Sequence, residues 1–411
     1  MARRLEQVFG IGEIRPYSYV DRGSLDERIG YLLRTDRHIA IHGDSKQGKS
    51  WLRERALPDA QVVRVQCTTE STAAQVMQQA LGLLGVRAEI RYTEERSLTG
   101  TIDLGASGQL GAKVAAQAKA QGKLSGQVGR TTSTESTAVG RTPADVPWIA
   151  LVLSASGRRL VLEDFHYLNS EEQRAFSFLM KALGEYGVRV VVVGVWAEDH
   201  LLAYHNGDLS GRVEDIKLVW EDSELEEVLQ KGSSELNIRF SEPLKEAMIA
   251  DSFGNIGLLQ RLAERVCMFG GVTTRSRRPQ LLDQELLPPA RSDIVDQMAG
   301  RFLTFVRRMR EARPSHVHVV SACATVSDDD LRAGVPVVDL AARCIGPNGR
   351  RRYSTADLRR RLEQLADAQS RALVFPPVLS FDAVGDRLFV VDRALLFYRK
   401  YSGASFMGGP S

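Results

Sequence analysis

A short run of small and polar residues has the spacing of a phosphate-binding loop. It fits the pattern G-x-x-x-x-G-K-S/T, and Trp51 follows it directly. The residues of the run are Gly43, Asp44, Ser45, Lys46, Gln47, Gly48, Lys49 and Ser50. Small residues let backbone N–H groups surround phosphate oxygens, and the N-terminus of a following helix favours anions. We therefore predict that residues 43–51 bind ATP, with Lys49 at the β- and γ-phosphates and the Ser50 hydroxyl on Mg²⁺.

A pair of acidic residues stands where a predicted strand ends. The sequence RLVLED, from Arg159 to Asp164, places Glu163 and Asp164 directly after apolar strand positions. One carboxylate at such a strand end can hold Mg²⁺ through water, and its neighbour can orient an attacking water by accepting its proton. The chain order assigns Glu163 to the metal and Asp164 to the water, and leaves open which of them is the base. His166 is a conceivable base, but a structural histidine is the preferred interpretation.

Apolar segments around these residues alternate between the spacing of strands and that of helices. Buried strands are predicted at residues 37–42, 62–65, 159–164, 188–195 and 215–219. Helices are predicted at residues 49–56, 73–84, 146–154 and 171–186. This alternation predicts an α/β fold with a five-stranded parallel sheet over residues 1–220.

Length and composition suit a chain of two or three globular domains. The chain has 411 residues, of which 43% are hydrophobic, so it can bury sizeable cores. No apolar run is long enough to span a bilayer, and the first residues lack the pattern of a secretion signal. The four cysteines are scattered without metal-ligand spacing, which suits buried thiols in a reducing compartment. We therefore expect a cytoplasmic protein with no membrane partner.

The remaining segments differ in composition from the predicted sheet region. Residues 97–145 are rich in Gly, Ala, Ser and Thr, which predicts a flexible insertion. Residues 221–272 have helical spacing, and residues 273–291 contain three prolines, as is typical of a linker. Residues 292–411 contain several helices before a hairpin whose turn is expected near Gly385 and Asp386. This order suggests a mainly helical, winged-helix-like C-terminal domain.

Positive charge is concentrated in the last third of the chain. From Thr273 to the end, 22 Lys and Arg stand against 15 Asp and Glu, although the whole chain has a net charge of only +3. Arginines at 350–352 and 359–361 flank a predicted helix start and could contact DNA phosphates. The alternative is a solvated arginine-rich surface without a nucleic-acid partner.

Residues 20–268 resemble the AAA+ and STAND group of P-loop ATPases. The resemblance rests on the loop, the Glu163-Asp164 strand end, the five predicted strands and the helical segment after them. It implies an ASCE-type core, a helical lid that folds over the nucleotide, and sites shared between subunits. It also implies that Tyr19 lines the adenine pocket and that Arg212 reaches a neighbouring subunit's γ-phosphate. The alternatives are a helix-capping turn at Tyr19 and a surface arginine at 212.

Three features depart from the pattern of that group. The acids stand in the order Glu then Asp, and Trp196 occupies the place of a small polar γ-phosphate sensor. The usual lid arginine is absent, because Gly257 and Leu258 stand there, with Arg261 one turn later. These departures predict slow hydrolysis and an altered sensor.

Three functions are compatible with these residues. The first is an ATP-binding and hydrolysing switch that forms a homo-oligomer in the ATP state and signals to a separate effector, for example in defence or regulation. The second is a DNA-binding AAA+ regulator of transposition, partition or replication. The third is an adaptor that holds a nucleotide without turnover.

Overall fold

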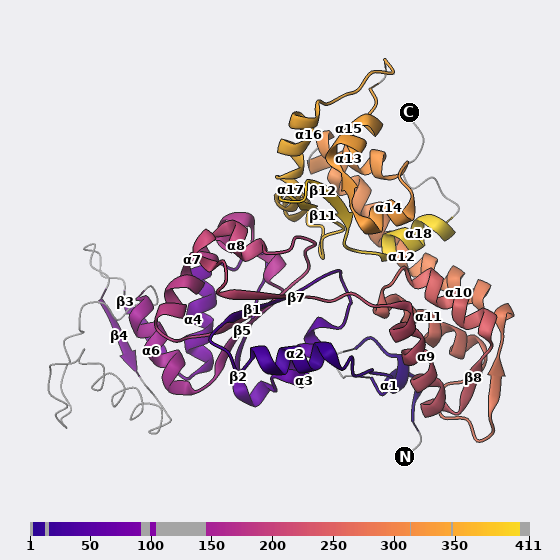
Figure 1. Cartoon of the computed structure of the whole chain (residues 1–411), viewed down its shortest axis with the longest axis horizontal. Helices are drawn as coiled ribbons and strands as arrows, with labels where there is room; N and C mark the ends of the chain where they lie inside the picture. Colours follow the sequence, from indigo (N-terminus) through magenta and orange to yellow (C-terminus); the bar gives the residue numbers. More distant parts are fainter. Residues whose placement is uncertain are drawn as a thin grey trace.

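The computed structural model describes residues 3–12, 16–91, 99–103, 145–312, 314–346 and 348–402. A central sheet with flanking helices forms the α/β core, and a helical lid and a C-terminal module follow it (Figure 1). We use "lid" for residues 221–282 and "C-terminal module" for residues 287–402. Within the described residues, every helix is too short or too polar to cross a membrane.

The core is a parallel sheet with the order β2-β5-β6-β1-β7. Its strands are β1 (His38–His42), β2 (Val62–Gln66), β5 (Arg159–Glu163), β6 (Val190–Val193) and β7 (Val213–Lys217). Their apolar, largely β-branched side chains are buried on both faces, as expected for a parallel sheet covered by helices. The predicted five-stranded parallel α/β core is therefore confirmed.

Helices cover both faces of this sheet. They are α2 (Ser24–Leu32), α3 (Lys49–Ala56), α4 (Ala73–Leu83), α6 (Val146–Ser156), α7 (Ser170–Glu185) and α8 (Leu201–His205). Side chains of α2 and α3 pack with Ile39 and Ile41 on one face, whereas those of α4, α6 and α7 pack with Ala40 on the other. Short 3-10 helices are η1 (Asp59–Gln61), η2 (Phe165–Tyr167), η3 (Gly207–Leu209) and η4 (Gln284–Leu286). The carboxyl ends of all five strands meet at one edge, where the loop lies.

Two predicted strands differ from the observed ones by two residues at both ends, and the other three differ by one residue at one end. Strand β6 is shorter than the predicted 188–195, because the chain leaves the sheet at Gly194 and bridges Gly43 through Trp196. Strand β7 begins two residues earlier than predicted. Most of the predicted insertion 97–145 lies outside the described residues. The part that is described includes β4 (Thr99–Asp103), which pairs with β3 (Arg87–Arg91) in an antiparallel ladder.

The lid is a helical bundle with a small parallel ladder. Its elements are α9 (Asp222–Leu236), β8 (Ile238–Phe240), α10 (Glu242–Ser252), α11 (Ile256–Phe269) and β9 (Gln280–Leu282). The N-terminal helix α1 (Leu5–Phe9) packs on it, with Phe9 fully buried near Phe240. Residues 273–291, for which the sequence predicts a linker, contain β9 and the start of α12. The two adjacent prolines fit the start of α12, because prolines are tolerated in a first helical turn.

The C-terminal module combines helices with a three-stranded antiparallel sheet of order β10-β12-β11. Its helices are α12 (Leu287–Ala312), α13 (Pro314–Cys323), α14 (Asp328–Ala333), α15 (Val337–Arg343), α16 (Thr355–Leu362), α17 (Leu365–Arg371) and α18 (Ala394–Tyr401). Its strands are β10 (Val335–Pro336), β11 (Leu379–Asp382) and β12 (Arg387–Val390). The predicted hairpin is confirmed, and Asp386 in its turn has a positive φ of 52°.

One continuous hydrophobic core joins the lid to the C-terminal module, whereas the sheet of the α/β core has separate cores on its two faces. The long helix α12 packs on both α11 and α18 and links the two parts. Lid and module are therefore packed to each other more extensively than either is to the sheet.

Candidate nucleotide site

The predicted phosphate-binding loop connects β1 to α3, which begins at Lys49. Its two glycines are required by the backbone. Gly48 has a φ of 82°, and Gly43 has a φ of 132°. A Cβ atom at Gly43 would lie only 2.8 Å from the carbonyl oxygen of Leu218. Residues with side chains rarely adopt such a φ, so these positions favour glycine.

The turn from α10 into α11, residues 253–257, is called the lid turn here, and it donates hydrogen bonds to two backbone carbonyl groups of the loop. The side-chain amide of Asn255 donates to the Ser45 carbonyl at 2.8 Å, and the Gly257 N–H donates to the Lys46 carbonyl at 3.1 Å. A Cβ atom at Gly257 would lie 2.7 Å from that of Lys46. The close backbone approach explains why no arginine can stand at this position of the lid turn.

Lys49 is buried within the loop. Its ammonium donates to the carbonyl oxygens of Gly43, at 3.2 Å, and of Asp44. Burial lowers the pKa of Lys49 to about 8, and the surrounding carboxylates only partly oppose this shift. A buried ammonium whose bonds are all to loop carbonyls is available to a phosphate that enters the loop.

Ser50 and Glu163 meet as the sequence predicts for a magnesium site. The Ser50 hydroxyl donates to Glu163 Oε2 at 3.2 Å, and Glu163 is 5% exposed. Burial raises the pKa of Glu163, although the guanidinium of Arg53 lies against it. A hydroxyl and a carboxylate are hard oxygen ligands, which are the ones that Mg²⁺ prefers. These residues therefore fit the metal.

Arg53 is a residue of this site that sequence reasoning missed. Its Nε donates to Glu163 Oε1 at 2.8 Å, and its Nη1 pairs with Asp59 at 2.7 Å. The spacing of Arg53 could have indicated it, because Lys49 and Arg53 stand one turn apart on α3 and therefore on the same face. Arg53 holds the Glu163 carboxylate beside Ser50.

Replacing Arg53 with methionine is expected to lower the free energy of unfolding by about 3 kcal/mol, because it leaves the buried Glu163 carboxylate without a cation. The matched control is Arg55→Met, whose partners Asp21 and Asp26 lie nearer the surface and whose loss should cost about 1 kcal/mol or less. Urea denaturation without nucleotide measures both values. Equal losses for the two variants would contradict the role given to the buried pair.

Asp164 lies beside the loop without a salt-bridge partner among the described residues. Its backbone has a φ of 54°, and its Oδ2 accepts a hydrogen bond from the Gln66 side chain at 2.5 Å. Gln66 was also missed, although it ends β2 at the sheet edge where Asp164 follows β5. Burial raises the pKa of Asp164. The geometry suits the predicted assignment of Glu163 to the metal and Asp164 to the water, which stays a prediction.

His166 is held as a neutral structural ring. Its Nδ1 accepts a hydrogen bond from the Val195 N–H at 3.2 Å. Burial lowers the pKa of His166 to about 3, with a smaller effect from Lys49. The ring is therefore neutral at pH 7, and its Nδ1 is already occupied, which supports the structural interpretation over that of a general base.

Two neighbouring cavities adjoin the loop. The larger, of about 640 Å³, is lined by the loop from Ser45 to Trp51 and by Glu163 and Asp164. The smaller, of about 20 Å³, is lined by Tyr19, Trp51 and Trp220. The indole N–H of Trp220 also donates to the Gln47 carbonyl at 3.2 Å. Phosphates fit the first cavity, whereas the second has room for about one water molecule, so a purine ring would enter it only if these aromatic side chains moved apart.

Arg212 does not join this site. It precedes β7 at the amino edge of the sheet, opposite the loop, and its Nη1 pairs with Glu185 at 2.6 Å. Its side chain is 49% exposed, and its role at a neighbouring subunit's γ-phosphate stays a prediction. Trp196 is buried and stacks on His42 with ring centroids 5.2 Å apart, whereas Val195 lines the nucleotide cavity.

The C-terminal module also touches the loop, which sequence reasoning did not foresee. The Ser45 N–H donates to the Val391 carbonyl at 2.8 Å, and Arg393 pairs with Asp44 at 2.5 Å. The Arg393 guanidinium also donates to the Phe253 carbonyl in the lid turn at 2.6 Å. The segment after β12 therefore joins the loop, the lid turn and the module.

Comparisons with known proteins bear on the fold. Scans of protein-family models and of curated proteins find no match to this chain. Among solved structures, a Walker-type ATPase of Pyrococcus abyssi matches with a TM-score of 0.51 at 13% identity, over 95% of this chain and 99% of that one. The Aeropyrum pernix Orc1 protein in complex with DNA matches with a TM-score of 0.39 at 11% identity, over 98% of this chain and 97% of that one. Thermotoga maritima RuvB matches with a TM-score of 0.38 at 12% identity, over 92% of this chain and 94% of that one. The first of these matches shows the fold, which is that of a Walker-type, P-loop ATPase.

Proposed function

We propose that this protein is an ATP-binding and hydrolysing switch, in which the nucleotide controls the position of the C-terminal module. The loop, Lys49, Ser50 and Glu163 would hold ATP and Mg²⁺, and the metal would supply charge neutralisation at the phosphates. Asp164, held by Gln66, would orient the attacking water and accept its proton. The buried Trp196 at the predicted sensor position, stacked on His42, supports slow turnover.

The observation that carries the proposal is the contact between the loop and the module. Arg393 links Asp44 of the loop to Phe253 of the lid, and its side chain is only 12% exposed. Next to it, buried Asp392 pairs with Arg301 at 2.5 Å and faces Lys46. Ion pairs of this kind are sensitive to any change of charge in the loop, and a triphosphate adds several negative charges there.

The backbone contact makes this coupling specific. The Ser45 N–H is bound to the Val391 carbonyl, so it is not available to a phosphate oxygen while the module stays in place. A phosphate that takes this N–H would break the contact, and the module would then lose one of its attachments to the core. A ligand shifts such an equilibrium by its difference in affinity for the two states.

Assembly in the ATP state is the second part of the proposal. Arg212 is half-exposed on the edge opposite the loop, where a neighbouring subunit could receive it. An arginine supplied in trans stabilises the charge of the phosphoryl-transfer transition state. Homo-oligomers formed in this way would present the released module to a separate effector protein.

Replacing Arg393 with alanine is expected to tighten ATP binding by about tenfold, because the nucleotide no longer competes with the restraint on the loop. Calorimetry with a non-hydrolysable ATP analogue measures the affinity. The matched control is Arg399→Ala, which removes an ion pair with Asp328 inside the module and should leave affinity unchanged. Unchanged or weaker binding in Arg393→Ala would show that this arginine does not restrain the loop.

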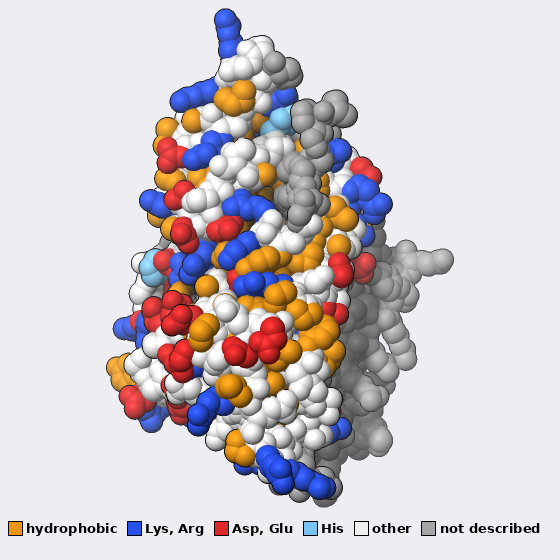
Figure 2. Space-filling view, turned by 90° about the vertical axis from the view of Figure 1, so that its right-hand side faces the viewer, with side chains coloured by type: hydrophobic (Ala, Val, Ile, Leu, Met, Phe, Trp, Pro, Cys, Tyr) orange, Lys and Arg blue, Asp and Glu red, His pale blue; other side chains and the backbone are white. Residues whose placement is uncertain are grey.

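A DNA-acting regulator is the second candidate, favoured by exposed Arg350, Arg351 and Arg352. The neighbouring arginines are already paired, since Arg359 binds Asp386 and Arg360 binds Asp357. Figure 2 shows Lys and Arg side chains interspersed with acids on one face of the lid and module. Salt-dependent binding of duplex DNA that is lost when the three exposed arginines are replaced by alanine would favour this candidate. A third candidate, an adaptor without turnover, requires tight ATP binding with no hydrolysis.

A further inference from the structure

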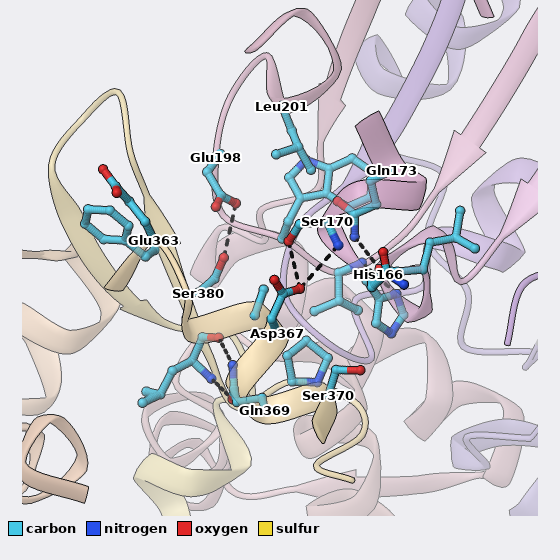
Figure 3. A pocket seen from close by; sticks show the side chains of 18 of the residues that line it. His166, Ser170, Gln173, Glu198, Leu201, Glu363, Asp367, Gln369, Ser370 and Ser380 are labelled. Atoms are coloured by element: carbon cyan, nitrogen blue, oxygen red, sulfur yellow. Dashed lines mark hydrogen bonds between the residues drawn. The ribbon is translucent and has the colours of Figure 1, made fainter. Parts of the chain in front are cut away.

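A cavity of about 140 Å³ lies between the α/β core and the C-terminal module. Figure 3 shows the side chains that meet there, with Glu198 joined to Ser380 and Asp367 joined to Ser170 across the two parts. The core contributes residues of η2, α7 and α8 and those after β6, and the module contributes α16, α17 and β11. Of its lining residues, it shares only His166 and Val195 with the nucleotide cavity.

The charges around this cavity are of one sign. Glu198 from the core and Glu363 and Asp367 from the module line it, and no Lys or Arg is among its described lining residues. The chain as a whole has 54 Lys and Arg, so the exclusion of cations here is unusual. Two histidines also line it, but burial lowers the pKa of both, to about 3 for His166, and they are neutral at pH 7.

Glu198 and Asp367 form no ion pair within the described residues, whereas Glu363 is exposed and interacts electrostatically with Arg359. Glu198 Oε2 accepts a hydrogen bond from the Ser380 hydroxyl at 3.1 Å, and Asp367 Oδ1 accepts one from the Ser170 hydroxyl at 3.0 Å. Burial raises the pKa of Glu198 to about 7. A cation that entered the cavity would compensate this partly buried carboxyl group.

The walls offer two further features that point to an organic ligand. Four aromatic side chains line the cavity: Trp196, Tyr204, Phe375 and Phe381. Trp196, which is 4% exposed, has its ring nitrogen buried without a hydrogen-bond partner, and so has His166 at Nε2. Because His166 Nδ1 accepts from Val195, its neutral ring carries the proton on Nε2. The wall thus contains two N–H donors that lack an acceptor.

We propose that this cavity binds a small organic cation, namely an amine or guanidinium compound that also carries a carbonyl or hydroxyl oxygen. The cationic group pairs with the carboxylates of Glu198 and Asp367 and lies against the aromatic walls. The ligand oxygen would accept from the unpartnered ring N–H groups of Trp196 and His166, which requires the cavity wall to rearrange. Nucleotides and other anions are excluded by the three acids.

Occupation of the cavity would also have a mechanical consequence. Glu198 belongs to the core, whereas Glu363 and Asp367 belong to the module, so one cation bridges the two parts. Such a bridge favours the arrangement in which the module stays against the core. Binding of the cation itself does not depend on ATP, and it can be tested in a variant that cannot bind nucleotide.

The test uses the full chain without nucleotide and arginine amide as the probe, because this compound carries a guanidinium, an ammonium and a carbonyl group. Nα-acetylcitrulline amide, in which a urea replaces the guanidinium and an amide replaces the ammonium, is its uncharged comparison. Calorimetry is expected to show saturable binding of arginine amide, weakened about tenfold or more for Nα-acetylcitrulline amide and for the Glu198→Gln variant. Ala366→Trp, at an exposed position of the cavity wall, should block binding, whereas Glu70→Gln on the surface should not.

Several outcomes would overturn the proposal. Arginine amide that does not saturate, or that binds equally to wild type, Glu198→Gln and Ala366→Trp, would mean that the cavity holds only water. Binding of a lysine- and arginine-rich peptide without binding of arginine amide would identify a protein-docking site instead. Because the same measurements are repeated in Lys49→Ala, a failure of the nucleotide site cannot be confused with a failure of this one.

Discussion

The Lys49→Ala variant is expected to lose ATP turnover and to bind ATP at least about 100-fold more weakly than the wild type. Lys49 is 7% exposed, and its ammonium stands inside the loop among carbonyl oxygens. A triphosphate bound there would exchange those weak neutral partners for negative oxygens in a site shielded from water. Loss of the ammonium therefore removes a charge-assisted contact from within the loop itself.

Two variants control for this result. Lys49→Arg keeps the charge but not the compact shape, so it should retain part of the affinity and little of the turnover. Lys181→Ala removes a lysine of α7 that pairs with Glu185 on the surface, and it should behave as the wild type. Calorimetry and a phosphate-release assay measure affinity and turnover separately. Normal turnover in Lys49→Ala would mean that the loop does not hold the reacting phosphates.

Asp164→Asn is expected to lower kcat by about 100-fold or more while ATP affinity stays unchanged. An amide cannot accept the proton of the attacking water, but it occupies the same volume and can still accept from Gln66. The side chain carries no salt bridge within the described residues, so the change does not leave a cation unpaired. The effect should therefore fall on the chemical step rather than on binding.

The Gln66→Ala variant separates positioning from proton transfer. It removes the hydrogen bond that fixes Asp164, and we expect a smaller fall in kcat, about tenfold, with the carboxylate still present. Asp208→Asn, an exposed position of η3, serves as the matched control. If Asp164→Asn hydrolyses ATP as fast as the wild type while Glu163→Gln does not, the two acids have the opposite roles from those assigned here.

The sheet and the loop could be predicted from the sequence because both depend on local patterns. Apolar runs such as Val190–Val193 have few alternatives to a buried strand, and the spacing of Gly43, Gly48 and Lys49 is set by backbone contact with phosphate. The carboxyl ends of parallel strands meet at one edge, which is why Ser50 and Glu163 were expected to be neighbours. The structure places them 3.2 Å apart.

The contacts that could not be predicted join residues that are distant in the chain. Arg393 and Asp44 are separated by most of the sequence, and nothing local distinguishes Arg393 from the other arginines of the module. Tertiary packing also decided the partners of Arg53 and Gln66, to which the sequence analysis assigned no role. Pro288 and Pro289, which the sequence analysis placed in a linker, stand in the first turn of α12.

The solution mass of the protein with a non-hydrolysable ATP analogue, with ADP and without nucleotide tests the central claim most directly. The proposed switch predicts a larger mass with the analogue, the same smaller mass in the other two conditions, and no increase in Lys49→Ala. A mass that is identical in all three conditions, with binding of the analogue shown by calorimetry, would contradict an ATP-driven assembly switch.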